Sequence, residues 1–133
     1  MTVSKSLSEV FRWPLFITYV VYLYFIFTAP PEKIPPAVLA ANDKVLHLLL
    51  FLILALLAFR TFFYSAVSFF RAHAVAKAVW FSAAYGMFLE WAQMAVPGRG
   101  TSFADWVADS LGILAAFGIV KISQKNPSPS LPV

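Results

Sequence analysis

The stretch VLHLLLFLILALLAFRTFF, residues 45–63, decides the fold class. It is apolar along most of its length, with His47 near its start and Arg60 near its end. An α-helix needs about 20 predominantly apolar residues to cross the hydrocarbon core of a bilayer. The stretch therefore predicts a membrane-spanning helix.

The composition of the whole chain agrees with this prediction. Of the 133 residues, 61% are hydrophobic and 12% are charged, whereas a soluble domain has about 45–50% apolar and about 25% charged residues. The absence of cysteine excludes disulfides, thiolate metal sites and cysteine nucleophiles. The net charge of +4 is explained by membrane topology, so no nucleic-acid partner is expected. At this length the chain is one domain, with no room for a separate soluble enzyme domain.

Three more segments have a suitable length and composition for spanning: 13–29, 75–96 and 103–122. We therefore predict an all-α, polytopic membrane protein with a four-transmembrane-helix bundle over 13–122. Pro14 is expected in the first turn of its helix, where its missing N–H costs little. The first apolar run exceeds the 7–15 residues usual for a signal peptide, so it is expected to stay uncleaved.

The basic residues predict the orientation. The side shared by the N-terminus, the second connection and the C-terminus holds seven of the ten: Lys5, Arg12, Arg60, Arg71, Lys77, Lys121 and Lys125. By the positive-inside rule, both termini are predicted to be cytoplasmic and the first and third connections to face outward. Residues 1–12 then form a cytoplasmic segment. Residues 123–133, polar and rich in Pro and Ser, form a cytoplasmic tail that is predicted to be disordered.

Polar residues gather on the outward side, above all in FLEWAQMAVPGRGTSFADWVAD, residues 88–109. The candidate site residues on that side are Asp43, Lys44, His47, Glu90, Gln93, Arg99, Asp105 and Asp109. His47, Glu90 and Asp109 belong to three different helices, each roughly 5–10 Å inside a helix end at 1.5 Å per residue. The sequence therefore predicts that these three groups share one layer of the membrane.

The residue spacing indicates which helix faces meet. Two stripes repeat every three or four residues: Ala83, Gly86, Glu90, Gln93 and Pro97, and Asp105, Asp109, Gly112 and Ala116. Each stripe is polar toward the outside and small deeper in, and small residues allow helices to approach closely. We expect a tight seam that opens into a polar pocket near the outer surface.

At these positions the chain resembles the VanZ-like family of bacterial membrane proteins. The resemblance rests on DKVLHLLLF (43–51) and YGMFLEWAQMAVPGRGTSFADWVADSLG (85–112). Position 109 departs from the family pattern, since Asp109 replaces a more usual asparagine. The resemblance implies a multi-pass protein of the bacterial inner membrane and, through the founding members, a link to teicoplanin resistance. It implies no settled reaction.

Three functional hypotheses follow, and whether the protein is an enzyme is left open. The favoured one is an outward pocket that binds a membrane lipid or a lipid-linked envelope precursor. The second is an enzyme acting on a lipid-linked phosphate or envelope precursor, with His47 or Glu90 as general acid or base and with Arg99 and Lys44 holding the anion. The third is a structural or metal-stabilised bundle. No cofactor is predicted, although one histidine and scattered carboxylates could hold a divalent cation, and no nucleophile or paired-ligand motif is present.

Some candidates also have purely structural explanations. Asp43 could cap its helix, and Ser102 with Asp105 has the spacing of a capping box. Lys44 could extend along the membrane interface, and Arg99 could be a solvated turn residue. Glu90 and Asp109 are hardest to explain in this way, because a carboxylate among membrane helices is expensive and is a functional candidate by default.

Overall fold

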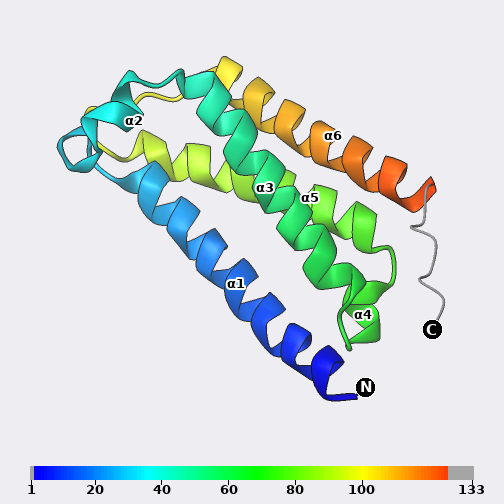
Figure 1. The fold of residues 1–133 in the computed structure, drawn as a ribbon. Helices are drawn as coiled ribbons and strands as arrows, with labels where there is room; N and C mark the ends of the chain where they lie inside the picture. The colour runs from blue at the N-terminus through cyan, green and yellow to red at the C-terminus, as the bar shows by residue number, and fades with distance from the viewer. Residues whose placement is uncertain (1, 126–133) are drawn as a thin grey trace.

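The computed structural model describes residues 2–125, which form four long helices with short connections (Figure 1). The long helices are α1 (Thr2–Thr28), α3 (Asp43–Phe63), α5 (Ala74–Met94) and α6 (Phe103–Lys125). Shorter elements connect them: η1 (Pro31–Lys33), α2 (Pro36–Ala40) and α4 (Ser68–Arg71). No strand occurs in residues 2–125, so the predicted all-α class is confirmed.

Three helical segments are long and apolar enough to cross a membrane. They are Val10–Thr28, Asp43–Phe63 and Phe103–Lys125, with mean hydropathies of 1.6, 2.4 and 1.6. Within the described chain, the fourth long helix, α5, has 21 residues but is not apolar enough to meet the same criterion. Its sequence includes Lys77, Ser82, Glu90 and Gln93, which lower its hydropathy.

The ends of the helices differ in places from those that the sequence predicts. The first helix begins at Thr2 instead of residue 13, so Pro14 lies inside the helix and not in its first turn. The apolar run marks where a membrane could begin, whereas helical geometry continues into the preceding polar residues. At the other end α6 continues to Lys125, so residues 123–125 of the predicted tail are helical and 126–133 lie outside the described residues.

Helix α3 is the centre of the bundle and contacts α1, α5 and α6. Its buried residues include Phe51, Leu54 and Ala58. The contact with α6 depends on Gly112, because a Cβ there would lie 2.3 Å from the backbone oxygen of Leu48. The small residue predicted for this seam is therefore required by backbone-to-backbone contact.

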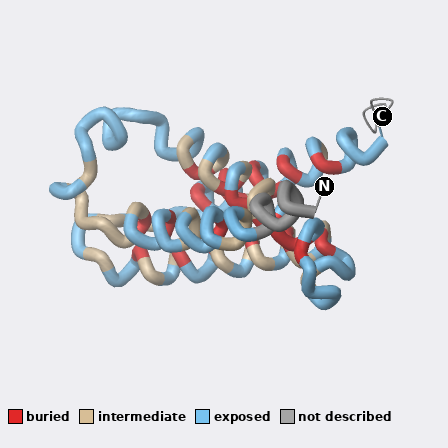
Figure 2. Tube along the Cα trace, turned by 60° about the horizontal axis from the view of Figure 1, so that its bottom comes forward, coloured by how far each residue is buried: buried red, intermediate tan, exposed pale blue. Residues whose placement is uncertain are grey.

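Much of the outer surface is apolar. Figure 2 shows buried residues along the inside of the helix bundle and exposed residues on its outside and in the connection that carries α2. Large hydrophobic side chains lie on that outside, with Trp80 75% exposed and Phe25 65% exposed. An apolar surface this extensive is typical of a protein surrounded by lipid.

The bundle has two chemically different ends. We name the end at which α3 and α6 begin the polar end; it comprises residues 29–47 and 90–109. The opposite end, comprising residues 10–13, 60–77 and 117–125, is the basic end. Because the four long helices alternate in direction, α1 begins and α6 ends at the basic end (Figure 1).

Candidate functional site

The polar end begins with a cap on α3. The side-chain oxygen of Asn42 accepts hydrogen bonds from the backbone N–H of Lys44, at 3.1 Å, and of Val45, at 3.3 Å. Asn42, and not Asp43, therefore caps this helix, since a capping residue precedes the first helical residue. Asp43 instead directs its carboxylate toward two neighbours, with Oδ2 3.2 Å from Lys44 Nζ and Oδ1 3.8 Å from His47 Nε2.

The start of α6 is a capping box, as the sequence predicts. The backbone N–H of Asp105 donates to Ser102 Oγ at 3.2 Å, and the backbone N–H of Ser102 donates to Asp105 Oδ2 at 2.9 Å. These reciprocal bonds satisfy two donors at the helix start. They also hold the Asp105 carboxylate against the bundle, where the residue is buried.

Three ionisable groups from three helices converge just below these caps. His47 of α3 lies with Nδ1 2.8 Å from Asp109 Oδ1 of α6 and 3.8 Å from Glu90 Oε1 of α5. His47 and Asp109 are both buried, and the Glu90 side chain is 13% exposed. We call these three residues the His-acid cluster. Their convergence from separate helices agrees with the shared depth predicted from the sequence.

Several oxygens of the His-acid cluster lack a hydrogen-bond partner. Both carboxylate oxygens of Glu90 and Oδ2 of Asp109 are inaccessible and receive no hydrogen bond. A buried acceptor without a donor is unfavourable by about 1–3 kcal/mol, and more if the group is charged. These atoms therefore require a proton or a cation to be stable where they are.

The cations of the polar end are already engaged. Lys44 Nζ contacts the carboxylate of Asp105 and lies 3.3 Å from Ser102 Oγ. With the Gln93 amide oriented so that its oxygen faces Arg99, that oxygen accepts from Nη2 at 2.8 Å and from Nε at 3.0 Å. Lys44 thus makes a specific ion pair across α3 and α6, and Arg99 contacts Gln93 and is not a solvated turn residue.

A pocket of about 420 Å³ adjoins the His-acid cluster on the side of α5 and α6. It is lined by Met87, Glu90, Trp91, Met94, Thr101, Ser102, Phe103 and Trp106. Of the predicted site residues, Glu90 lines this pocket, whereas His47, Gln93, Asp105 and Asp109 are buried behind it. These five predicted site residues are therefore divided between the pocket wall and the buried interior.

The sequence analysis did not identify the apolar lining of this pocket. Met87, Trp91 and Met94 lie on α5 at spacings of four and three residues, which places them on one helix face beside Glu90. That spacing was available in the sequence. Its pairing with Phe103 and Trp106 of α6 was not, because it depends on how the two helices pack.

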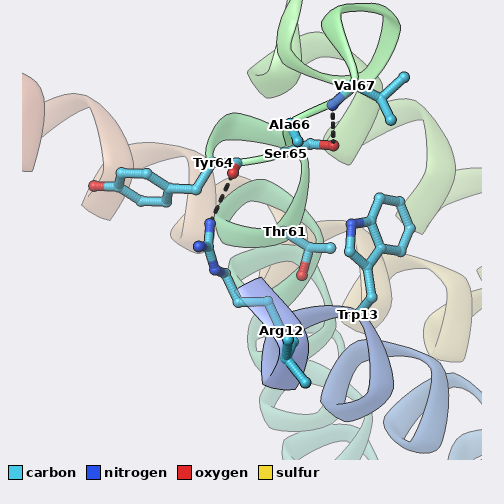
Figure 3. Close-up of a pocket in the computed structure, with 8 residues that line it drawn as sticks. Arg12, Trp13, Thr61, Tyr64, Ser65, Ala66 and Val67 are labelled. Carbon is cyan, nitrogen blue, oxygen red and sulfur yellow. Dashed lines mark hydrogen bonds between the residues drawn. The ribbon is translucent and has the colours of Figure 1, made fainter. Parts of the chain in front are cut away.

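The basic end also has pockets, but of a different kind. One of about 300 Å³ lies between the start of α1 and the end of α3 (Figure 3). There, Arg12 Nη1 donates to the backbone oxygen of Tyr64 at 2.9 Å, and the Val67 N–H donates to Ser65 Oγ at 3.1 Å. A second, of about 690 Å³, includes Arg71, His73 and Lys121 in its lining. Neither contains a carboxylate in its lining.

Comparison with known proteins identifies one family. The family model described as VanZ/LLP1 matches residues 4–124, which is nearly the whole chain. No match was found among curated proteins or among solved structures. The matched range contains every residue of the polar end and all four long helices apart from Thr2, Val3 and Lys125.

Proposed function

This chain belongs to the VanZ/LLP1 family, and we propose that it is a four-span protein of the bacterial inner membrane that binds a lipid-linked envelope molecule at its polar end. Both termini are then cytoplasmic, and the polar end faces outward. The observation that carries the proposal is the pocket between α5 and α6, which combines an apolar wall with the hydroxyl-bearing residues Thr101 and Ser102 and with Glu90.

The proposed fourth span is α5. Its 21 residues reach about 31 Å at 1.5 Å per residue, close to the hydrocarbon thickness of about 30 Å. Its polar residues Ser82 and Gln93 are buried inside the bundle, whereas Trp80 and Met94 are exposed. The modest hydropathy of α5 thus comes from residues that would not meet lipid.

The proposed orientation follows from the seven of ten basic residues assigned to the side of the basic end. A reporter that is active only in the cytoplasm should work when fused after Val133, and one that is active only outside should work when inserted at Pro36. An externally active reporter at the C-terminus would overturn the four-span proposal.

The pocket suits a molecule with an apolar tail and a polar head. Met87, Trp91, Met94, Phe103 and Trp106 offer apolar contact, and Thr101, Ser102 and Glu90 offer polar groups. Pockets for small molecules are usually apolar with a few polar groups that fix orientation. Because Trp91 and Met94 are also exposed, a lipid tail could enter from the side without crossing the bundle.

The charge of the polar end favours a head group that donates hydrogen bonds. Five carboxylates at this end, those of Glu32, Asp43, Glu90, Asp105 and Asp109, face three fixed cations, Lys33, Lys44 and Arg99. Lys44 and Arg99 are already engaged with Asp105 and Gln93. A phosphate held by Lys44 and Arg99, as the enzyme hypothesis requires, would have to displace these partners. A head group with hydroxyl or ammonium groups is instead attracted by the net negative charge and can bond to the hydroxyls of Thr101 and Ser102 in the pocket wall.

Photo-crosslinking tests the proposal with a matched pair of positions. Met94 in the pocket wall and Phe25 on α1 are 62% and 65% exposed and both are apolar. A photoreactive amino acid at 94 should capture a discrete lipid-linked molecule, identified by mass spectrometry, whereas at 25 it should capture only bulk phospholipid. Identical adducts at the two positions would contradict the proposed binding site.

Teicoplanin susceptibility is the cellular readout that the family resemblance suggests. Thr101→Trp fills the pocket and should shift susceptibility toward that of cells without the protein, at equal membrane abundance. Phe25→Trp is the control and should have no effect. If Thr101→Trp leaves susceptibility unchanged, the site has no connection to this antibiotic.

A further inference from the structure

The His-acid cluster contains more negative charge than the surrounding residues neutralise. Glu90 and Asp109 contribute two carboxylates, and three of their four oxygens have no hydrogen-bond donor. The Lys44 ammonium contacts Asp43 and Asp105 instead. Such a group is stable only if protons or a cation supply the missing positive charge.

The three side chains already have the spacing of ligands around one ion. One atom each from His47, Glu90 and Asp109 can be chosen so that all three lie within 4.8 Å of one another. In a tetrahedral site with bonds of about 2.0–2.2 Å, adjacent ligand atoms lie about 3.4 Å apart. His47 Nδ1 lies 2.8 Å from Asp109 Oδ1 and 3.8 Å from Glu90 Oε1, so small side-chain movements would bring the three atoms to this separation.

The surroundings of His47 are those of a metal ligand. Its other ring nitrogen, Nε2, lies 3.8 Å from Asp43 Oδ1, which is longer than a hydrogen bond. A small movement of the exposed Asp43 side chain would give the carboxylate hydrogen bond on the far nitrogen that usually supports a metal-bound histidine. The Phe27 ring packs edge-on against the imidazole, with the centroids 4.9 Å apart. Together these contacts limit the orientation of the ring.

A glycine keeps space open beside the unpartnered carboxylate. A Cβ on Gly86 would lie 3.6 Å from Asp109 Oδ2, the buried oxygen without a donor, and 2.9 Å from the Phe51 ring. Gly86 precedes Glu90 by one helical turn. No side chain of α5 therefore covers Asp109 Oδ2 from this position.

From these contacts we propose that His47, Glu90 and Asp109 bind one divalent transition-metal ion between α3, α5 and α6. One imidazole nitrogen with carboxylate oxygens suits Zn²⁺ or Mn²⁺ better than Ca²⁺ or Mg²⁺, which prefer oxygen ligands alone. This site goes beyond the proposed ligand pocket and does not depend on it. Since Glu90 belongs to both, the ion would lie next to the head group of any bound molecule.

A second group of possible ligands lies nearby but gives weaker support for a metal site. Asp43, His47 and Asp105 also have ligand atoms within 4.8 Å of one another. However, the ammonium of Lys44 contacts both of those carboxylates, so part of their charge is already neutralised. Asp105 is therefore a matched control for Asp109, since both are buried aspartates on α6, four residues apart.

The test is zinc binding by the full-length protein purified in detergent without a histidine tag. After removal of metal with a chelator, Zn²⁺ is added and unbound ion is removed, and the metal is counted by mass spectrometry. The wild type should retain about one Zn²⁺ per chain, as expected for a single three-ligand site. No retained zinc would overturn the proposal.

Matched variants locate the ion. His47→Gln, Glu90→Gln and Asp109→Asn should each weaken Zn²⁺ affinity by more than the 10–100-fold typical of losing an outer partner. Asp105→Asn and His73→Gln, which alter an acid beside Lys44 and a histidine at the basic end, should change it by less than about tenfold. Size-exclusion profiles identify any variant that fails to fold. Equal affinity in the two sets would contradict the site, because the ion would then lie elsewhere.

Discussion

The two ends of the molecule stabilise their charged groups by different means. At the basic end, cations contact backbone carbonyls and aromatic faces: Arg71 Nη1 lies 2.9 Å from the oxygen of Ser65, and Lys77 lies 3.9 Å from the centre of the Phe69 ring. Arg12 and Tyr64 show the same arrangement in Figure 3. At the polar end, carboxylates contact His47 and Lys44. Both carboxylate oxygens of Glu90 and Oδ2 of Asp109 have no hydrogen-bond partner.

This difference separates the charged groups that the fold alone explains from those that it does not. The carbonyls at the end of α3 attract cations without any dedicated partner, because the helix dipole is negative there. Long cationic side chains can also keep their charge near the membrane surface. Glu90 and Asp109 have shorter side chains inside the bundle. They are therefore not stabilised by the carbonyls of a helix end, and they cannot extend to the membrane surface. The proposed binding sites would account for their presence, whereas the basic residues need no such explanation.

Substitution of the glycines on α6 should give the largest difference in stability between the two ends. Gly112→Ala at the polar half puts a Cβ 2.3 Å from the backbone oxygen of Leu48, whereas Gly118 has no atom within 4 Å of a new Cβ. Gly112→Ala should lower the free energy of unfolding in detergent by about 3 kcal/mol or more. Gly118→Ala should raise it by about 0.5–1 kcal/mol. Equal melting temperatures for the two variants would show that α6 does not pack on α3 this closely.

Added zinc should stabilise the polar end in a way that depends on Glu90. A ligand that binds only the folded state adds about 2.7 kcal/mol at 100 times its Kd. Wild type should therefore melt at a higher temperature with Zn²⁺, and Glu90→Gln should not respond. Without metal, Glu90→Gln should be at least as stable as wild type, since it removes a buried charge without a partner. A zinc response that survives Glu90→Gln would exclude Glu90 as a ligand.

Removing a lysine should matter more at the polar end than at the basic end. Lys44→Met leaves the buried Asp105 carboxylate without its cation, although Ser102 still donates to it. Because the Lys44 side chain is about half exposed, we expect a loss of about 1–2 kcal/mol. Lys77→Met removes contacts to the Phe69 carbonyl and ring but leaves no buried charge unpaired, and it should cost less than about 1 kcal/mol. Chemical denaturation of both variants measures the difference.

The smallest expected effect concerns the helix starts. Ser102→Ala removes the acceptor for the Asp105 N–H in the capping box and should cost about 1 kcal/mol. Ser68→Ala is the control at the basic end, because α4 has no side-chain cap, and it should change stability by less than about 0.5 kcal/mol. Thermal unfolding of the two variants side by side compares these helix starts.

Local features of this protein were predictable from sequence. The capping box at Ser102 and Asp105 and the start of α6 at Phe103 depend on residues close together in the chain, so their spacing was enough. The length of α1 could not be predicted, because hydropathy does not distinguish helical residues outside the membrane from other polar segments. The sequence allows Asp43 to cap α3, but Asn42 and Asp43 are both good capping residues, and the structure shows that Asn42 is the cap.

Composition and the constant rise per residue along a helix were enough to predict the all-α class, the membrane-spanning segments and the common level of His47, Glu90 and Asp109 along the bundle. They could not predict that His47 and Asp109 are buried while Glu90 also lines a pocket, or that Lys44 contacts Asp105. The physical reason is that these contacts depend on the rotation and approach of α3, α5 and α6, which packing sets between residues far apart in the chain.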